Sequence, residues 1–181
     1  MSTPVVSSRK SFFLPLAIMV VLVGALGYGL THVSRDLQSP LLGKPAPAFR
    51  LPVLGNIAIY TDGNLKGRPL LVNFFASWCA ACQVEHPVLM KLAHQQNIEI
   101  VGMDYKDTTA DITAWLAKNG NPYRTVVMDE QGTAGLDWGV YGVPETYAIN
   151  AQGVIVYKHI GAMTEEVWRS KIAPLLAGAP R

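Results

Sequence analysis

The sequence predicts an α/β fold in which helices cover both faces of a mixed central sheet, preceded by one N-terminal transmembrane helix. Three observations lead to this prediction. Residues 12–30 contain no charged side chain. After them, apolar strand patterns alternate with helical patterns, which is typical of a sheet covered by helices. The chain then closes with a β-hairpin pattern and a last helical pattern, so the sheet should be mixed.

The composition indicates one domain with an apolar extension. The chain has 181 residues, a formal net charge of +2 and 50% hydrophobic residues. This length suits one domain plus an extension, and much of the excess apolar character lies near the N-terminus. The small net charge gives no argument for a nucleic-acid partner. The sequence also shows no phosphate-binding glycine loop and no Ser/His/Asp arrangement that indicates hydrolysis.

The N-terminal segment predicts an uncleaved membrane anchor. As a helix, residues 12–30 would span about 28 Å, close to the thickness of a bilayer core. Arg9 and Lys10 precede this segment, so the positive-inside rule places residues 1–11 in the cytoplasm and the rest of the chain in the periplasm. A cleaved signal peptide is the alternative, with small residues at 25–27 as the cleavage site. The apolar run continues past that site, which favours a single-pass anchor in the inner membrane.

Residues 31–42 are expected to form a polar tether, and residues 43–181 are expected to form the folded domain. Proline-rich residues 43–47 mark its start. Strands are expected at residues 49–54, 57–60, 69–76, 98–103, 123–128, 144–150 and 154–160. Helices are expected from Trp78 to about residue 96, at residues 107–119 and at residues 164–176.

The strand at 69–76 and the helix after it form the centre of the predicted domain. The continuous hydrophobicity of this strand fits a buried central position. In the following helix, Val84, Val88 and Leu92 recur at every fourth residue and predict a buried stripe. Pro87 lies inside the helix and is expected to kink it.

The only two cysteines of the chain, Cys79 and Cys82, lie where this strand meets this helix. Residues three apart on a helix occupy neighbouring turns of one face, so the two sulfurs can form a disulfide. If Cys79 opens the helix, unpaired N–H groups and the positive end of the helix dipole favour its thiolate. Cys79 is therefore expected to be the nucleophile, and Cys82 to resolve the mixed disulfide.

Structural thiols and a zinc site are the alternatives for this cysteine pair. A zinc site needs further ligands at suitable spacing, and His86, His94 and His159 form no second ligand pair. We therefore expect no metal and no cofactor. An exported domain meets an oxidising compartment, where one CxxC pair without structural disulfides is suited to thiol exchange.

The domain at about residues 43–181 resembles the thioredoxin fold. Its active-site segment matches in the order of a strand followed by Trp78, Cys79 and Cys82. Pro87, five residues after the second cysteine, also matches. Pro144 matches the position at which thioredoxins keep a cis-proline that faces the disulfide, although the sequence alone does not give its isomer.

Three longer segments resemble the membrane-anchored thioredoxin-like proteins of cytochrome c maturation, the CcmG/DsbE family. They are Gly43-Lys44-Pro45-Ala46-Pro47-Ala48-Phe49 with Leu51-Pro52, Trp78-Cys79-x-x-Cys82-x-x-Glu85-His86-Pro87, and Gly139-Val140-Tyr141-Gly142-Val143-Pro144-Glu145-Thr146. The resemblance implies a periplasmic reductant, which takes electrons from a membrane thiol transporter. The acceptor it implies is apocytochrome c, whose haem-binding cysteines must be reduced, or a thiol protein associated with haem ligation.

Two departures bear on the redox chemistry. Ala80-Ala81 separates the cysteines, where family members often carry proline, so the reduction potential is not carried over. Asn73 stands where thioredoxins have a buried aspartate, and an amide cannot exchange a proton at neutral pH. Glu85 is the candidate to replace that acid, because it lies one turn after Cys82 on the same helix face. Burial would raise its pKa and let it exchange a proton with Cys82. The alternative is a solvated surface glutamate.

The resemblance also implies a substrate groove beside the disulfide. Trp78, Tyr141, Val143 and Glu145 are its candidates, and Val143 can offer backbone hydrogen bonds to a docked peptide. Core packing of Trp78 and a simple strand start at Glu145 are the alternatives. His86 is expected to be a surface or capping histidine. A monomer is expected, and the competing functions are a thiol oxidoreductase of another periplasmic pathway and a non-catalytic docking or metal-carrying module.

Overall fold

The structure, a computed structural model, describes residues 10–32, 39–96 and 98–177. The chain forms two units, Met1–Leu37 and Gln38–Arg181. The first contains helix α1 (Lys10–His32), which includes the uncharged segment. Within the described residues, no helix combines the length and the apolar character that crossing a membrane requires. Residues 1–9 of the expected cytoplasmic segment and residues 33–38 of the expected tether lie outside the described residues.

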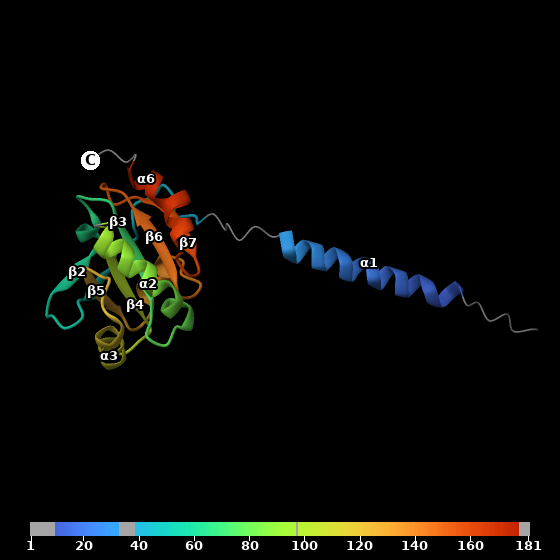
Figure 1. The fold of residues 1–181 in the computed structure, drawn as a ribbon, viewed down its shortest axis with the longest axis horizontal. Helices are drawn as coiled ribbons and strands as arrows, with labels where there is room; N and C mark the ends of the chain where they lie inside the picture. Colours follow the sequence, from blue (N-terminus) through green and yellow to red (C-terminus); the bar gives the residue numbers. More distant parts are fainter. Residues whose placement is uncertain (1–9, 33–38, 97, 178–181) are drawn as a thin grey trace, which may run out of the picture. The chain divides into compact units, whose positions relative to one another are not determined.

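A five-stranded mixed sheet forms the centre of the second unit, in the order β5-β4-β3-β6-β7 (Figure 1). The strands are β3 (Leu70–Phe75), β4 (Glu99–Tyr105), β5 (Thr125–Asp129), β6 (Glu145–Ile149) and β7 (Ile155–Ile160). Strand β3 pairs in parallel with β4 and antiparallel with β6. The predicted mixed sheet and the central position of this strand are therefore confirmed.

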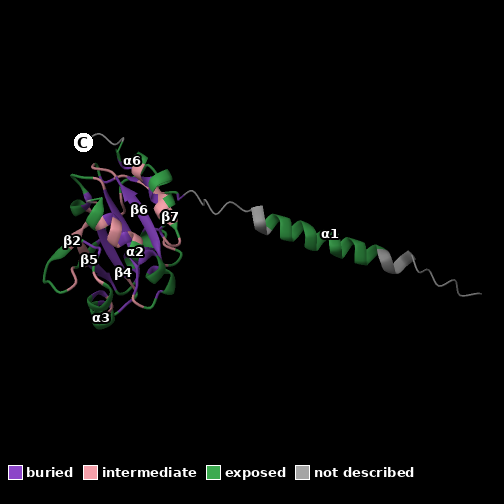
Figure 2. Cartoon of the chain, viewed as in Figure 1, coloured by how far each residue is buried: buried purple, intermediate pink, exposed green. Residues whose placement is uncertain are grey.

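Side chains of β3 alternate between two apolar cores. Leu71 and Phe75 belong to one core, and Leu70, Val72 and Phe74 belong to the other. Because successive side chains of a strand point to opposite faces, this strand is buried on both sides. Figure 2 shows the strands as mostly buried, whereas parts of the helices are exposed.

Five helical segments contribute side chains to the first core. They are α2 (Ala80–Gln95), α3 (Thr109–Asn119), α5 (Glu165–Val167), the π-helical segment η2 (Trp168–Ile172) and α6 (Ala173–Ala177). The other core receives side chains from the short 3₁₀ segment η1 (Asp62–Leu65) and from α4 (Thr133–Asp137). A separate antiparallel pair, β1 (Arg50–Pro52) and β2 (Ile59–Thr61), packs Leu51 and Tyr60 against it.

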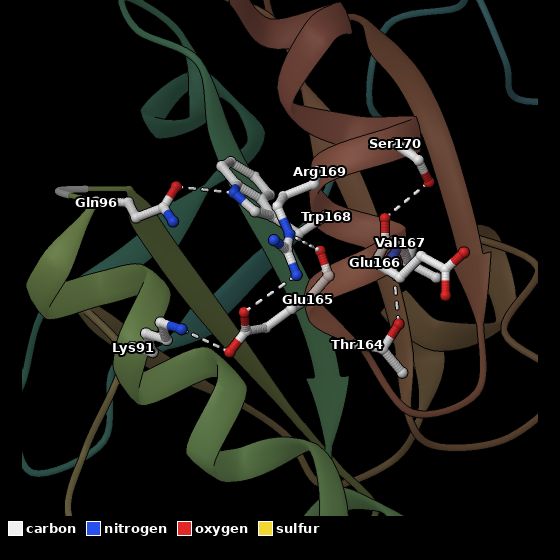
Figure 3. Close-up of polar contacts among 9 residues, drawn as sticks. All are labelled: Lys91, Gln96, Thr164, Glu165, Glu166, Val167, Trp168, Arg169 and Ser170. Atoms are coloured by element: carbon white, nitrogen blue, oxygen red, sulfur yellow. Dashed lines mark hydrogen bonds and ion pairs between the residues drawn. The ribbon is translucent and has the colours of Figure 1, made fainter.

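The C-terminal helical segment is fastened to α2 by polar contacts (Figure 3). The Lys91 ammonium lies 2.6 Å from Glu165 Oε1, and the Trp168 indole donates a 2.8 Å hydrogen bond to Gln96. Thr164 caps the segment by accepting a hydrogen bond from the Val167 N–H, as its position at the predicted helix start suggests. These contacts hold the chain around residue 163 against α2.

The structure corrects two local predictions. The prediction that Val84, Val88 and Leu92 form a buried stripe is wrong, because Val84 is 73% exposed. The buried residues of α2 are Cys82, Glu85, His86, Leu89 and Leu92. The second correction concerns residues 129–143, where the apolar pattern indicated no helix and the structure has α4. Asp129 accepts hydrogen bonds from the backbone N–H groups of Ala134 and Gly135 and so stabilises this short helix.

Candidate active site

Cys79 and Cys82 form a disulfide at the start of α2. Cys79 is the N-cap residue of the helix, with φ −88° and ψ 108°, and its sulfur accepts a 3.0 Å hydrogen bond from the Cys82 N–H. A sulfur in this position faces the unpaired N–H groups of the first helical turn, which stabilise negative charge. Both cysteines are nearly inaccessible, at 4% and 2% exposure.

Glu85 lies one turn after Cys82 on the buried face of α2, with 1% of its surface exposed. Its Oε1 accepts a 2.9 Å hydrogen bond from Asn73 Nδ2, and its Oε2 accepts a 2.7 Å hydrogen bond from the Met163 N–H. Burial raises the pKa of Glu85 to about 7, against the opposing effect of these two hydrogen bonds. Glu85 is therefore not a solvated surface glutamate, and it can gain or lose a proton near neutral pH.

Asn73 connects Glu85 to two further buried side chains. Its Nδ2 also donates to Thr146 Oγ1 at 3.0 Å, and its Oδ1 accepts a 2.9 Å hydrogen bond from the Tyr123 hydroxyl. Burial, followed by the charges of nearby carboxyl groups, raises the pKa of Tyr123 well above its ordinary value. Tyr123 therefore remains a neutral donor, and it fixes the orientation of the Asn73 amide.

The loop before β6 lies against the disulfide. The Val143–Pro144 peptide bond is cis. The Val143 carbonyl oxygen lies 3.4 Å from Cys79 Sγ. Val143 is half-buried and Pro144 is buried. The loop thus covers the first sulfur, and the structure gives the isomer that the sequence left open.

Trp78 and Tyr141 are the exposed aromatic residues of this region, at 59% and 76% exposure. The Trp78 indole N–H donates to the Lys106 carbonyl oxygen at 3.1 Å, which fixes its ring beside the CxxC turn. Because the ring is mostly exposed, a pure core role for Trp78 is excluded. Both aromatic side chains are available to a docking partner.

The prediction that Glu145 lines the substrate groove is wrong, because its side chain is fully buried at the start of β6. Its Oε1 accepts a hydrogen bond from the Tyr141 N–H, and its Oε2 lies 2.9 Å from the buried Lys158 ammonium. Lys158 also donates to the Gly139 carbonyl oxygen. The pair therefore braces the loop that carries Val143 from inside the domain.

Sequence reasoning missed Tyr123, Thr146, Met163 and Lys158 as parts of this arrangement. Only Thr146 lay within a quoted motif, and no spacing signal pointed to the others. His86 is a capping histidine, since its Nε2 contacts the Asn119 carbonyl oxygen at the end of α3. It is buried rather than at the surface, and burial lowers its pKa. In the described part of the chain, no cluster of three or more His, Cys, Asp or Glu residues could hold a metal ion.

Comparison with known proteins agrees with this geometry. The Redoxin family matches residues 41–176. The chain is 45% identical over 168 residues to the thiol:disulfide interchange protein DsbE of Pseudomonas aeruginosa, covering 92% of this chain and 93% of that one. It is 46% identical over 173 residues to the thiol:disulfide interchange protein HelX of Rhodobacter capsulatus, covering 94% and 98%.

A solved structure shows the same fold. The thio-disulfide isomerase of Thermus thermophilus superposes with a TM-score of 0.62 at 23% identity, over 77% of this chain and 99% of that one. This likeness confirms the thioredoxin-like fold. Together with the CxxC disulfide, the matches show that the chain belongs to the Redoxin family and, within it, to the DsbE/HelX (CcmG) thiol:disulfide interchange proteins, and that it is a thiol:disulfide oxidoreductase.

Proposed function

We propose that the chain is a periplasmic reductant in the maturation of c-type cytochromes, with Cys79 as nucleophile, Cys82 as resolving thiol and Glu85 as their acid/base. The observation that carries this proposal is the buried Glu85 carboxyl, which lies one helical turn from Cys82 and has a pKa of about 7. An acid that titrates near the working pH is suited to proton transfer.

In the reduced protein, the Cys79 thiolate attacks one sulfur of a partner disulfide. A mixed disulfide forms, and the first partner sulfur leaves as a thiolate. Glu85 accepts the proton of Cys82, and the resulting Cys82 thiolate attacks Cys79 Sγ. The Cys79–Cys82 disulfide forms, the second partner thiolate leaves, and the partner has gained two electrons. A dithiol donor then reduces Cys79–Cys82 by the same exchange in reverse.

The partner is expected to dock beside the CxxC turn. Trp78 and Tyr141 offer exposed aromatic surface there. The half-buried Val143 and the cis-Pro144 supply the backbone against which an extended peptide segment can lie. Glu145 contributes indirectly, because its pairing with Lys158 holds this loop in place.

The partners and the location complete the proposal. We infer a membrane thiol-electron transporter as donor and apocytochrome c, or a thiol protein associated with haem ligation, as acceptor. On sequence grounds, residues 12–30 anchor a monomer in the inner membrane, residues 1–11 lie in the cytoplasm, residues 31–42 form the tether, and residues 43–181 act in the periplasm. Extraction of membranes with alkaline carbonate tests the anchor, since an anchored chain stays in the pellet.

A trapping experiment tests the chemistry. The full chain with Cys82→Ser is mixed with a peptide that carries an oxidised Cys-x-x-Cys-His haem-binding segment. We expect a covalent mixed disulfide through Cys79, and no adduct with Cys79→Ser. If the Cys79→Ser chain still supported cytochrome c maturation fully, this would contradict the mechanism and favour a non-catalytic docking module. Preferential reaction with disulfides of other periplasmic proteins would favour a different thiol pathway.

A further inference from the structure

A buried lysine contacts the loop that precedes cis-Pro144. The side chain of Lys158 comes from β7 and is 3% exposed. Lys158 is the register partner of Tyr147 on β6, so the two side chains lie on the same face of the sheet. A buried ammonium is costly unless it is paired and hydrogen-bonded, so Lys158 needs partners inside the domain.

Two polar groups of the loop and of the start of β6 bind the Lys158 ammonium. It donates a 2.7 Å hydrogen bond to the Gly139 carbonyl oxygen and lies 2.9 Å from Glu145 Oε2. The other carboxylate oxygen, Glu145 Oε1, accepts the Tyr141 N–H at 2.9 Å. Lys158 therefore binds the loop directly at Gly139 and, through Glu145, at the backbone of Tyr141.

The aromatic ring of Tyr141 is a further partner of the same ammonium. Lys158 Nζ lies 4.8 Å from the centroid of the Tyr141 ring and 5.2 Å from the centroid of the Tyr147 ring. At such distances a cation is attracted to the face of an aromatic ring. Tyr147 is fully buried, whereas Tyr141 is 76% exposed. One face of the Tyr141 ring is thus held by a buried cation, while most of the side chain remains accessible to a partner.

This contact changes what an exposed tyrosine can do in docking. An exposed side chain without a fixed contact samples several rotamers and loses this freedom when a partner binds. A ring that is already held in one orientation avoids much of that cost, and tyrosine offers a large contact area. The ammonium of Lys158 therefore preorganises the aromatic surface beside the CxxC turn.

We propose that Lys158 is a positioning residue for partner docking, which fixes the Tyr141 ring and the Gly139 carbonyl in the arrangement that a partner peptide meets. The inference rests on the proposed function, because it requires a partner that docks beside the CxxC turn. The polar contacts described for Lys158 are with the loop and with Glu145. Its effect is therefore expected on docking rather than on the exchange of the sulfurs.

Stopped-flow kinetics of the reduced full chain in mild detergent, with rising excess of the oxidised Cys-x-x-Cys-His peptide, test the docking role. Lys158→Met/Glu145→Gln removes cation and carboxylate together and leaves no buried charge unpaired. The half-saturating peptide concentration should rise several-fold, and the limiting rate should stay near that of wild type. Lys171→Met/Glu166→Gln, the same pair of changes at exposed positions, should match wild type in both values. An unchanged half-saturating concentration, or a loss confined to the limiting rate, would overturn the proposal.

Tyr141→Leu tells whether Lys158 acts through the aromatic ring. Tyr141→Leu alone should also raise the half-saturating peptide concentration. Because both changes remove the same docking surface, adding Tyr141→Leu to Lys158→Met/Glu145→Gln should cause little further increase. Two effects that multiply in the triple variant would show that Lys158 does not act through the ring, and would overturn the proposal.

An NMR measurement without a partner separates this inference from the proposed function. Protons above the face of an aromatic ring are shifted upfield by its ring current. In the disulfide form, the Lys158 Hε protons should move downfield in Tyr141→Leu, while those of the exposed Lys171 should not move. Unmoved Lys158 protons would overturn the inference, even if the chain reduces the peptide. If they move but wild type does not react with the peptide, the proposed function fails and the docking role fails with it.

Discussion

Asn73 donates a buried 2.9 Å hydrogen bond to Glu85, and this contact joins the strand that leads to the active site with the helix that carries both cysteines. An amide cannot exchange protons, so at this position it can only orient its neighbours. Thioredoxins have a buried aspartate at the position of Asn73, on the strand. In this chain the titratable group is Glu85, on the helix. The acid/base role proposed for Glu85 depends on this arrangement.

Replacing Glu85 by Gln should remove a pH-dependent part of the stability. Because the folded state binds this proton more tightly than the unfolded chain, the free energy of unfolding falls as pH rises from 4.5 to about 7, and this contribution is constant above that. This difference between the two pKa values corresponds to about 3 kcal/mol in the free energy of unfolding. Urea unfolding at several pH values measures it, and Glu166→Gln, at an exposed position, is the control.

The same substitution should slow catalysis. Without a proton acceptor, resolution of the mixed disulfide by Cys82 is expected to fall about 10²-fold or more at pH 7, the usual contribution of general acid–base catalysis. Stopped-flow kinetics with a disulfide peptide measure this step. A rate and pH profile equal to those of wild type would mean that Glu85 has only a structural role.

Asn73→Asp should place a second carboxyl group against Glu85. Two carboxyl groups in contact cannot both ionise readily, so the pair should lose its last proton only above pH 7. Carbon-13 NMR titration of the side-chain carboxyl groups reports this directly. Asn56→Asp, in an exposed turn, should leave the Glu85 titration where it was.

Lys158→Met should destabilise the domain by about 3–5 kcal/mol, because it leaves the buried Glu145 carboxylate without its cation. The double variant Lys158→Met/Glu145→Gln should recover most of this loss, since no buried charge remains. Denaturant unfolding measures both, with the exposed Lys171→Met as control. If the single and double variants were equally unstable, the ion pair would not be the cause.

Gly102→Ala should disturb the orientation of Tyr123. A Cβ atom at this position would lie 2.8 Å from Phe75 Cε1 and 2.9 Å from Tyr123 Cγ, so one of these two rings, which pack against each other, must move. A loss of about 1–3 kcal/mol is expected from such overpacking. Gly142→Ala, where no atom lies within 4 Å of the added carbon, should have a much smaller effect on unfolding.

The fold and the cysteine pair were accessible from the sequence because they depend on local patterns. A continuous apolar run predicts a buried strand, and cysteines three apart at its end predict a disulfide at a helix start. The prediction of the buried side of α2 was wrong, because the periodicity counted Val84 as a buried apolar residue. It also could not show that Glu85 accepts hydrogen bonds from Asn73 and from the Met163 N–H inside the domain.

The long-range partners could not be predicted. Tyr123 reaches Asn73 across 50 residues of chain, and Met163 reaches Glu85 across 78. The Glu145–Lys158 pair joins neighbouring strands, but a strand pattern alone does not tell whether a charged side chain points to solvent or inward. Resemblance suggested an exposed acid at Glu145, whereas Lys158 allows it to be buried.

The reduction potential tests the central claim, that this oxidoreductase acts as a reductant. The full chain in mild detergent is equilibrated with glutathione buffers of known ratio, and the fraction with the Cys79–Cys82 disulfide is determined by alkylation and mass spectrometry. A potential of about −180 mV or lower is expected for a reductant. A potential near about −120 mV, as in strongly oxidising disulfide-forming proteins, would contradict the proposal and point to disulfide formation instead.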